Sequence, residues 1–292
     1  MFIGNAKIIN LLNKAIQNSK VSQAYLFSGP EGVGKFFLAK NFARSVIKGT
    51  ELDFKDDRKM LADILILKPE IEEKKGVIKE KEIKVEHIRN IQKDLSLFPY
   101  DGKYKVLIIN DAHKMSVSAQ NSLLKILEEP NATSIIILVT HNDSKIISTI
   151  KSRCQRMNFS LVDLKEIEKI AGNNEDVIKF SMGRPGLVFR ILENKGELDN
   201  KTKELEDLKR FSDLGINERL KLAEKMSSDS MKTIQRLEFW MWIIRSSADL
   251  RGLNADLTRK YEMIEKISKA LETIKGTNAN TRLVLENLFL EI

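Results

Sequence analysis

The 292-residue sequence predicts an α/β domain with a parallel sheet, followed by all-α domains. Short apolar runs alternate with amphipathic stretches over residues 1–157, which is typical of a sheet with helices on both faces. After residue 158 the strand-like runs disappear. The chain is 42% hydrophobic but only 7% aromatic, with 14 Gly and 5 Pro. This composition predicts a helix-rich protein with an aliphatic core and excludes collagen-like and disordered classes.

Each element of the α/β part has its own local signal. The spacing of Ile8, Leu11, Leu12 and Ala15 predicts an amphipathic helix over residues 5–19. Four short apolar runs predict buried strands: Ala24–Phe27, Asp63–Lys68, Val106–Ile109 and Ile135–Val139. The intervening patterns predict helices over 35–47, 84–97 and 116–129, the last stopped by Pro130. The highly charged segment 70–84 is expected to be an exposed hairpin or loop.

The remainder of the chain is expected to be helical. Residues 162–192 carry short helical patterns around a break at Gly183–Gly186. Residues 197–292 hold four or five amphipathic helices, including Met231–Leu250 with Trp240 and Trp242, which we expect to be core or interface anchors. We therefore expect three domains, at 1–157, 158–196 and 197–292.

Composition also limits the class of protein and its compartment. The net charge of +8, from 49 basic and 41 acidic residues, is compatible with nucleic-acid binding. The two signs are interleaved, as on solvated helices, and no DNA-reading motif is recognisable. The single Cys154 excludes an internal disulfide framework and predicts a reducing compartment. The N-terminal residues do not predict a signal peptide, and no apolar run approaches the ~18 residues of a membrane helix, so we expect a cytoplasmic protein without a membrane partner.

A glycine loop is the clearest functional motif. Residues Gly29–Lys35 have the spacing G-x-x-x-x-G-K, between a predicted strand and a predicted helix. In such a loop backbone N–H groups curl around phosphate oxygens and the helix N-terminus adds partial positive charge. The sequence therefore predicts a phosphate-binding loop with Gly29, Gly32, Gly34 and Lys35 as its binding residues; an ordinary glycine turn is the alternative.

The two positions that would hold Mg²⁺ are both altered. Phe36 occupies the position of the Ser or Thr whose hydroxyl ligates the ion. Asn110 stands at the strand end where a metal-ligating Asp belongs, and Asp111 where ATPases place a Glu. A strand register shifted by one would move Asp111 to the metal position and leave Phe36 unexplained. We expect no intrinsic ATPase activity and no required cofactor, while ATP or ADP binding without hydrolysis stays open.

Other chemistry-bearing residues have plainer expected roles. His87, His113 and His141 show no ligand partners at metal spacing and are expected on the surface, so no metal is predicted. Cys154 is expected to be a packing residue. Thr140 and Asn142 follow the fourth strand, where they are either a polar sensor of phosphate or loop-capping residues.

Several motifs together resemble the AAA+ ATPase-fold subunits of bacterial clamp loaders. The resemblance is carried by residues 23–35 (QAYLFSGPEGVGK), 97–115 (LFPYDGKYKVLIINDAHKM), 121–130 (NSLLKILEEP) and 149–154 (TIKSRC). It is strong over residues 1–155, moderate around 183–187 and only architectural beyond. It implies a RecA-like AAA+ domain, a small helical lid and a C-terminal helical collar that oligomerises.

The resemblance also implies a role for Arg153. In this family the arginine of the Ser-Arg-Cys motif reaches into the ATP site of a neighbouring subunit, and such fingers contribute ~10³–10⁵ in rate. It implies a non-hydrolysing subunit of the DNA polymerase III clamp loader, in a pentamer with ATPase subunits and delta, which meets the sliding clamp and primer–template DNA. An active ATPase with an atypical metal site and a stand-alone DNA-binding module are the alternatives.

Three departures from the family pattern are visible. Residues 44–63 contain no Cys or His, so the four-cysteine zinc module of many members is absent and no zinc is expected. Gln23 replaces the usual His. By register Gly186 stands where active relatives carry a sensor arginine, and Arg184 is the alternative for that role.

Overall fold

The computed structural model describes residues 2–54, 61–74, 77–246, 257–277 and 279–292. The chain forms two compact units. The first comprises Met1–Asn173 with Gly183–Gly186, and the second comprises Asn174–Met182 with Leu187–Ile292. The division predicted at residues 157 and 196 stays a prediction. Of the predicted elements, the turn of the 70–84 hairpin at 75–76 and the end of the 231–250 helix at 247–250 lie outside the described residues.

A five-stranded parallel sheet forms the centre of the first unit, in the order β2-β5-β6-β1-β7. Its strands are β1 (Ala24–Ser28), β2 (Ile64–Leu67), β5 (Lys105–Ile109), β6 (Ser134–Thr140) and β7 (Gln155–Asn158). Every residue of β1, β5 and β6 is buried, as expected of strands covered on both faces. The four apolar runs were therefore correctly predicted as strands of a parallel sheet.

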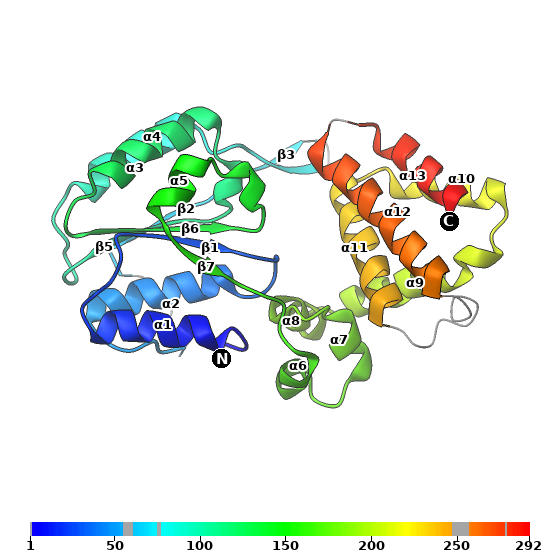
Figure 1. Ribbon diagram of the computed structural model, residues 1–292, viewed down its shortest axis with the longest axis horizontal. Helices are drawn as coiled ribbons and strands as arrows, with labels where there is room; N and C mark the ends of the chain where they lie inside the picture. The colour runs from blue at the N-terminus through cyan, green and yellow to red at the C-terminus, as the bar shows by residue number, and fades with distance from the viewer. Residues whose placement is uncertain (1, 55–60, 75–76, 247–256, 278) are drawn as a thin grey trace. The chain divides into compact units, whose positions relative to one another are not determined.

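Helices cover both faces of this sheet (Figure 1). One face carries α1 (Ala6–Gln17) and α2 (Lys35–Lys48); the other carries α3 (Val85–Leu95), α4 (Val117–Glu128) and α5 (Ser148–Arg153). The strands alternate between two cores, because successive side chains of a strand point to opposite faces. Tyr25 and Phe27 pack with Leu38 and Phe42 of α2, whereas Leu26 packs on the face of α3 and α4.

The edge strand β7 is a difference from the prediction, which placed no strand after β6. Gln155 to Asn158 pair in parallel register with Tyr25 to Ser28. Only Met157 of this strand is buried. An edge strand with one buried residue has no apolar run, so periodicity alone could not reveal it.

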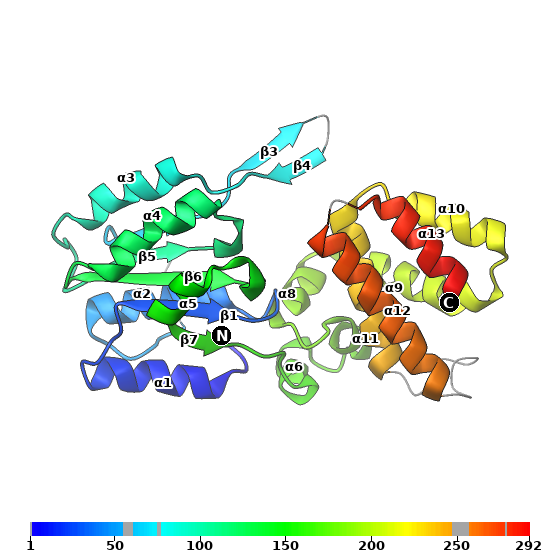
Figure 2. The ribbon, with the colours of Figure 1, turned by 45° about the horizontal axis from the view of Figure 1, so that its top comes forward.

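The charged segment before α3, expected to be a hairpin or a loop, forms a hairpin. The strands β3 (Ile71–Lys74) and β4 (Val77–Glu80) pair antiparallel and extend away from the main sheet (Figure 2). The first unit also contains α6 (Leu164–Ala171).

The second unit consists of helices. They are α7 (Glu175–Phe180), α8 (Pro185–Glu193, whose first two residues belong to the first unit), α9 (Lys195–Arg210), α10 (Ile216–Met226), α11 (Ser230–Ser246), α12 (Leu257–Gly276) and α13 (Thr281–Glu291). Trp240 is fully buried at its centre, in ring contact with Phe211 and Phe289, and its indole N–H donates to the Glu204 carbonyl at 3.0 Å. Of the two roles expected for Trp240, core or interface anchor, the structure shows the core one. Within the described ranges, none of the helices combines the length and apolar character needed to cross a bilayer.

Candidate functional site

The glycine loop has the conformation that phosphate loops need. Gly29, Gly32 and Gly34 have φ angles of 143°, 79° and 90°, which favour glycine. A Cβ at position 29 would lie 2.3 Å from the Phe159 carbonyl oxygen, so a side chain there would require a backbone shift. Gly34 then caps α2. The loop thus presents backbone N–H groups at the N-terminus of a 14-residue helix.

Lys35 lies across this loop. It is 6% exposed, and its Nζ donates to the carbonyl oxygens of Gly29 and Pro30 at 2.7 and 2.5 Å. Burial lowers the pKa of Lys35 to about 8. The nearby charge of Arg184 also lowers this pKa, whereas the carboxylates of Glu31 and Asp111 raise it. The Lys35 ammonium therefore donates to carbonyl oxygens of its own loop, the same group that binds phosphate oxygens in phosphate-binding loops.

Asn110 and Asp111 follow β5 at the carboxyl end of the sheet. The backbone N–H of Asn110 continues the pairing with β2 through the Leu67 carbonyl. Its side-chain amide donates to Oδ2 of Asp111 at 2.8 Å. Asp111 has a left-handed φ of 52° and begins the short helix η1 (Ala112–Lys114). The structure therefore brings both predicted residues of this strand end to the same edge of the sheet as the glycine loop.

A cleft of about 280 Å³ lies between the glycine loop and the ends of β5 and β6. Its lining includes Gly32, Gly34, Lys35, Phe36, Asn110, Asp111, Thr140, His141 and Gly186. Phe36 is partly buried, packs against the core beneath α2 and carries Lys40 Nζ 5.1 Å from its ring centroid. An apolar ring thus lines the cleft at the position where ATPases place a hydroxyl.

Gly186 contacts the glycine loop directly. Its backbone N–H donates to the Gly32 carbonyl at 2.8 Å, and a Cβ at position 186 would lie 3.0 Å from that oxygen. This close approach makes glycine the residue that fits. The place that the resemblance assigns to a sensor arginine therefore offers a backbone contact and no side chain.

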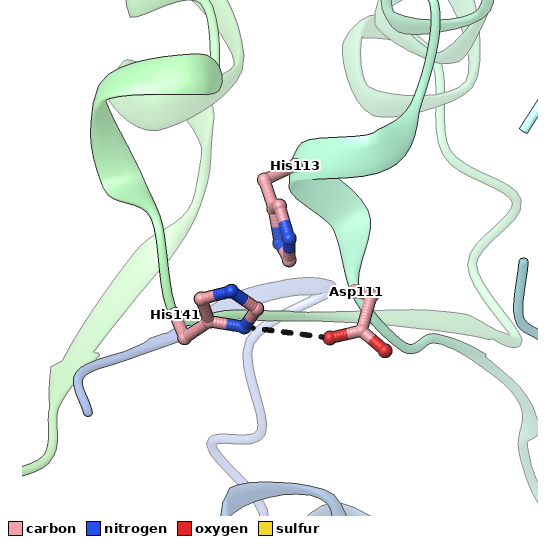
Figure 3. A group of neighbouring side chains, drawn as sticks. All are labelled: Asp111, His113 and His141. Carbon is pink, nitrogen blue, oxygen red and sulfur yellow. Dashed lines mark ion pairs between the residues drawn. The ribbon is translucent and has the colours of Figure 1, made fainter. Parts of the chain in front are cut away.

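The expectation for the histidines was wrong in part. His113, in η1, is only 8% exposed, and its ring lies 4.1 Å, centroid to centroid, from that of His141, which follows β6. Nδ1 of His141 lies 3.6 Å from Oδ1 of Asp111 (Figure 3). These three residues do bring ligand atoms within 4.8 Å of one another, although their spacing in the chain did not suggest it. A signal was present, because both histidines follow the carboxyl ends of apolar strands, and such ends meet at one edge of a parallel sheet.

Thr140 connects this group to the sheet. It is fully buried at the end of β6, and its Oγ1 lies 3.3 Å from Nδ1 of His113. The backbone N–H of Asn142 donates to the same hydroxyl at 3.0 Å. Of the two roles left open for Thr140, this geometry supports the loop-capping one. Burial lowers the pKa of His113 to about 4, with the His141 charge adding to the effect, so the imidazole of His113 is neutral near pH 7.

Arg153 lies at the amino end of the strands, whereas the cleft lies at their carboxyl end. It ends α5 immediately before β7, whose first residue pairs with Tyr25 near the start of β1. It lines a second pocket, of about 530 Å³, together with residues that precede β1 and β6, such as Gln23 and Ala132. The glycine loop follows the other end of β1. Arg153 and Lys35 are thus separated by the length of a strand, and Arg153 does not contribute to the cleft.

Cys154 is buried beside Arg153. Burial raises the pKa of its thiol to about 12, which leaves it protonated and unreactive near neutral pH. It packs in the core on the α3 and α4 face, as predicted.

The parallel sheet, its helices on both faces and the glycine loop that opens α2 define a RecA-like domain of the AAA+ class. A gamma-subunit-related protein of DNA polymerase III from Thermotoga maritima has the same fold, with a TM-score of 0.51, 18% identity and 97% of each chain covered. A family model described as DNA polymerase III, delta subunit, matches residues 4–163. The chain belongs to this family.

Sequence relatives agree with this assignment. The chain is 31% identical to the tau subunit of DNA polymerase III from Bacillus subtilis, over 94% of this chain and 58% of that protein. It is also 31% identical to the delta' subunit of the same organism, over 56% of this chain and 49% of that protein. The chain thus spans about half the length of the curated relatives it matches, and both tau and delta' proteins are among them.

Proposed function

We propose that this chain is a delta'-type subunit of a DNA polymerase III clamp loader that does not hydrolyse ATP and supplies Arg153 to a neighbouring ATPase subunit. In this proposal it assembles with the ATPase subunits and delta in a pentamer, through a helical collar at residues 197–292. The complex would then load the sliding clamp at primer–template DNA.

The position of Arg153 carries the proposal. It stands at the amino edge of the sheet, away from its own cleft, and its side chain is 37% exposed. A guanidinium is charged at any relevant pH and can bind two phosphate oxygens at once. An arginine so placed can reach a nucleotide only when that nucleotide belongs to another subunit.

The cleft supports the other half of the proposal. Phe36 and Asn110 replace two Mg²⁺ ligands, and Gly186 offers no side chain toward the loop. Phosphoryl transfer depends on a metal ion and positive groups that neutralise charge on the γ-phosphate. Lys35 remains in this cleft, but with Phe36 and Asn110 at the two metal-ligand positions the cleft can hold phosphate on its loop without the Mg²⁺ ion that phosphoryl transfer needs.

The test compares reconstituted clamp-loader complexes that contain unmodified chain, Arg153→Lys or Arg153→Ala. We expect normal assembly, partial loss of DNA-stimulated ATP turnover and a larger loss of clamp loading for both variants, because lysine is a point charge. A matched control is Arg156→Ala, since Arg156 lies three residues further along the chain, in β7, and its side chain is also exposed. Equal activity in all four complexes, with equal assembly, would overturn the proposed role of Arg153.

The isolated chain tests the competing function of an active ATPase. We expect no Mg²⁺-dependent turnover above background, and no change in that background for Lys35→Ala. Turnover near ~1 s⁻¹, within the usual enzyme range, that Lys35→Ala abolishes would assign the chain to the active ATPases instead.

A further inference from the structure

We propose that Asp111, His113 and His141 form a binding site for a divalent transition-metal ion of the Zn²⁺, Co²⁺ and Ni²⁺ class. The three side chains come from two loops, at the ends of the neighbouring strands β5 and β6, and converge on one point (Figure 3). The site differs in its ligands from the Mg²⁺ site of an ATPase, and it does not depend on the proposed role in clamp loading.

The distances suit a metal ion with small side-chain adjustments. One ligand atom from each residue lies within 4.8 Å of the other two, and Asp111 Oδ1 is already 3.6 Å from His141 Nδ1. Around a tetrahedral ion with bonds of about 2.0–2.1 Å, neighbouring ligand atoms stand about 3.3 Å apart. The remaining difference is at most about 1.5 Å between any two ligand atoms, a distance of the size that side-chain rotation covers.

The donor set selects the metal. Two imidazoles and one carboxylate suit Zn²⁺ and its neighbours in the first transition row. Mg²⁺ prefers six oxygen ligands in octahedral geometry, and of these three side chains Asp111 alone offers a charged oxygen. The replacement of the strand-end Asp by Asn110 therefore removes a magnesium ligand, while His113 and His141 add nitrogen ligands beside it.

An outer set of hydrogen bonds orients two of the ligands. Thr140 Oγ1 lies 3.3 Å from Nδ1 of His113, which leaves Nε2 of that ring as the ligand nitrogen. The side-chain amide of Asn110 donates to Oδ2 of Asp111, so Oδ1 is the oxygen that faces His141. Metal ligands are commonly held by such outer partners, which fix the tautomer and the ring orientation. In this chain the outer partners are part of the sheet and its strand ends.

The site is reachable from the cleft. Asp111 and His141 both line the 280 Å³ cleft, whereas His113 is buried behind them. Water or a small anion can therefore complete the coordination of an ion held by three protein ligands.

The experiment uses the full chain, freed of metal with a chelator and then titrated with Co²⁺ while its visible absorption is followed. We expect one ion per chain, displaced by Zn²⁺ and not by a large excess of Mg²⁺. His141→Ala should weaken binding by at least ~10-fold, since the loss of a ligand costs no less than that of an outer partner. Thr140→Val should weaken it by about 10–100-fold through the orientation of His113.

His87→Ala is the matched control. His87 is as exposed as His141, at 34% against 33%, and it also lies near one carboxylate, Glu70, at 4.0 Å. It has no second histidine beside it in the described part of the chain. Its substitution should leave the Co²⁺ affinity unchanged.

Three results would overturn the inference: no saturable Co²⁺ binding, binding that His141→Ala leaves intact, or displacement of Co²⁺ by Mg²⁺. His141 is the deciding position, because its exposed side chain can be removed without disturbing the core, whereas a His113 variant can lose its fold. Circular dichroism of each variant checks the fold before the titration. Failure here would leave the proposed role of Arg153 untouched, since that role is read from assembly and clamp loading.

Discussion

The guanidinium of Arg153 lies 2.7 Å from the carboxylate of Glu128, at the end of α4. Its other terminal nitrogen donates to the Thr149 carbonyl, one turn earlier in α5, at 3.1 Å. The arginine proposed to act on a neighbour is thus held by its own chain through an exposed ion pair. Exposed pairs contribute about 0.2–1 kcal/mol, so the arginine can leave this position at small cost.

This pair leads to a prediction for Glu128→Gln. We expect the free energy of unfolding to change by less than about 1 kcal/mol, because both side chains are partly exposed. In the reconstituted complex, release of Arg153 should increase the apparent ATP affinity of the adjacent site by up to about 5-fold, which corresponds to that energy. Glu129→Gln, which removes the same charge one residue along, is the control. A loss of ATPase activity in Glu128→Gln alone would show that the pair positions Arg153 rather than retains it.

Lys35 predicts an increase of stability at alkaline pH. The unfolded chain keeps this proton up to a pKa near 10.5, whereas the folded chain releases it at a pKa of about 8. Between these values the unfolded state binds more protons, so the free energy of unfolding rises with pH, and below about pH 8 the cost of the buried charge is fully present. The shift is equivalent to roughly 3 kcal/mol.

The measurement is urea unfolding from pH 7.5 to 10.5. Lys35→Met should remove this rise, while Lys7→Met, on the exposed part of α1, should keep it. Parallel pH profiles for the unmodified chain and Lys35→Met would contradict the prediction.

Trp240 is predicted to dominate the stability of the second unit. Its ring is fully buried between Phe211 and Phe289, and Trp240→Ala should cost about 3–5 kcal/mol through lost contacts and a cavity. Met231→Ala in the same helix should change stability by less than about 0.5 kcal/mol, because Met231 is 59% exposed. Denaturant unfolding followed by circular dichroism compares the two variants. A similar small effect for both would show that this aromatic cluster is not the core.

Cys154 is predicted to resist thiol reagents until the first unit unfolds. Its thiol pKa of about 12, against an ordinary value of 9.0, corresponds to about a thousandfold less thiolate, which is the reactive form. Ellman's reagent should therefore react slowly with the native chain and rapidly in denaturant. Because this is the single cysteine of the chain, the signal reports on one site. Rapid reaction of the native chain, with its circular dichroism unchanged, would contradict the buried position.

Local patterns were enough to predict much of the fold. Buried strands such as Ala24–Ser28 and Ser134–Thr140 appear as apolar runs because a parallel sheet is covered on both faces. The glycine loop is recognisable because its backbone angles require glycine at set intervals. Phe36 directly follows this loop, and Asn110 directly follows the apolar run Val106–Ile109. Both residues could therefore be assigned to metal-ligand positions from the sequence.

The convergence of Asp111, His113 and His141 is decided by the tertiary structure. His141 lies 28 and 30 positions beyond the other two, and the three meet because β5 and β6 are neighbours in the sheet. Strand order is set by the packing of whole helices against both faces, which no short window of sequence contains. The pairing of Arg153 with Glu128 has the same origin, because it depends on how α5 packs beside α4. The strand β7 forms by pairing its backbone with β1. Every residue type except proline can make such backbone hydrogen bonds, so the pairing does not require a particular side-chain pattern.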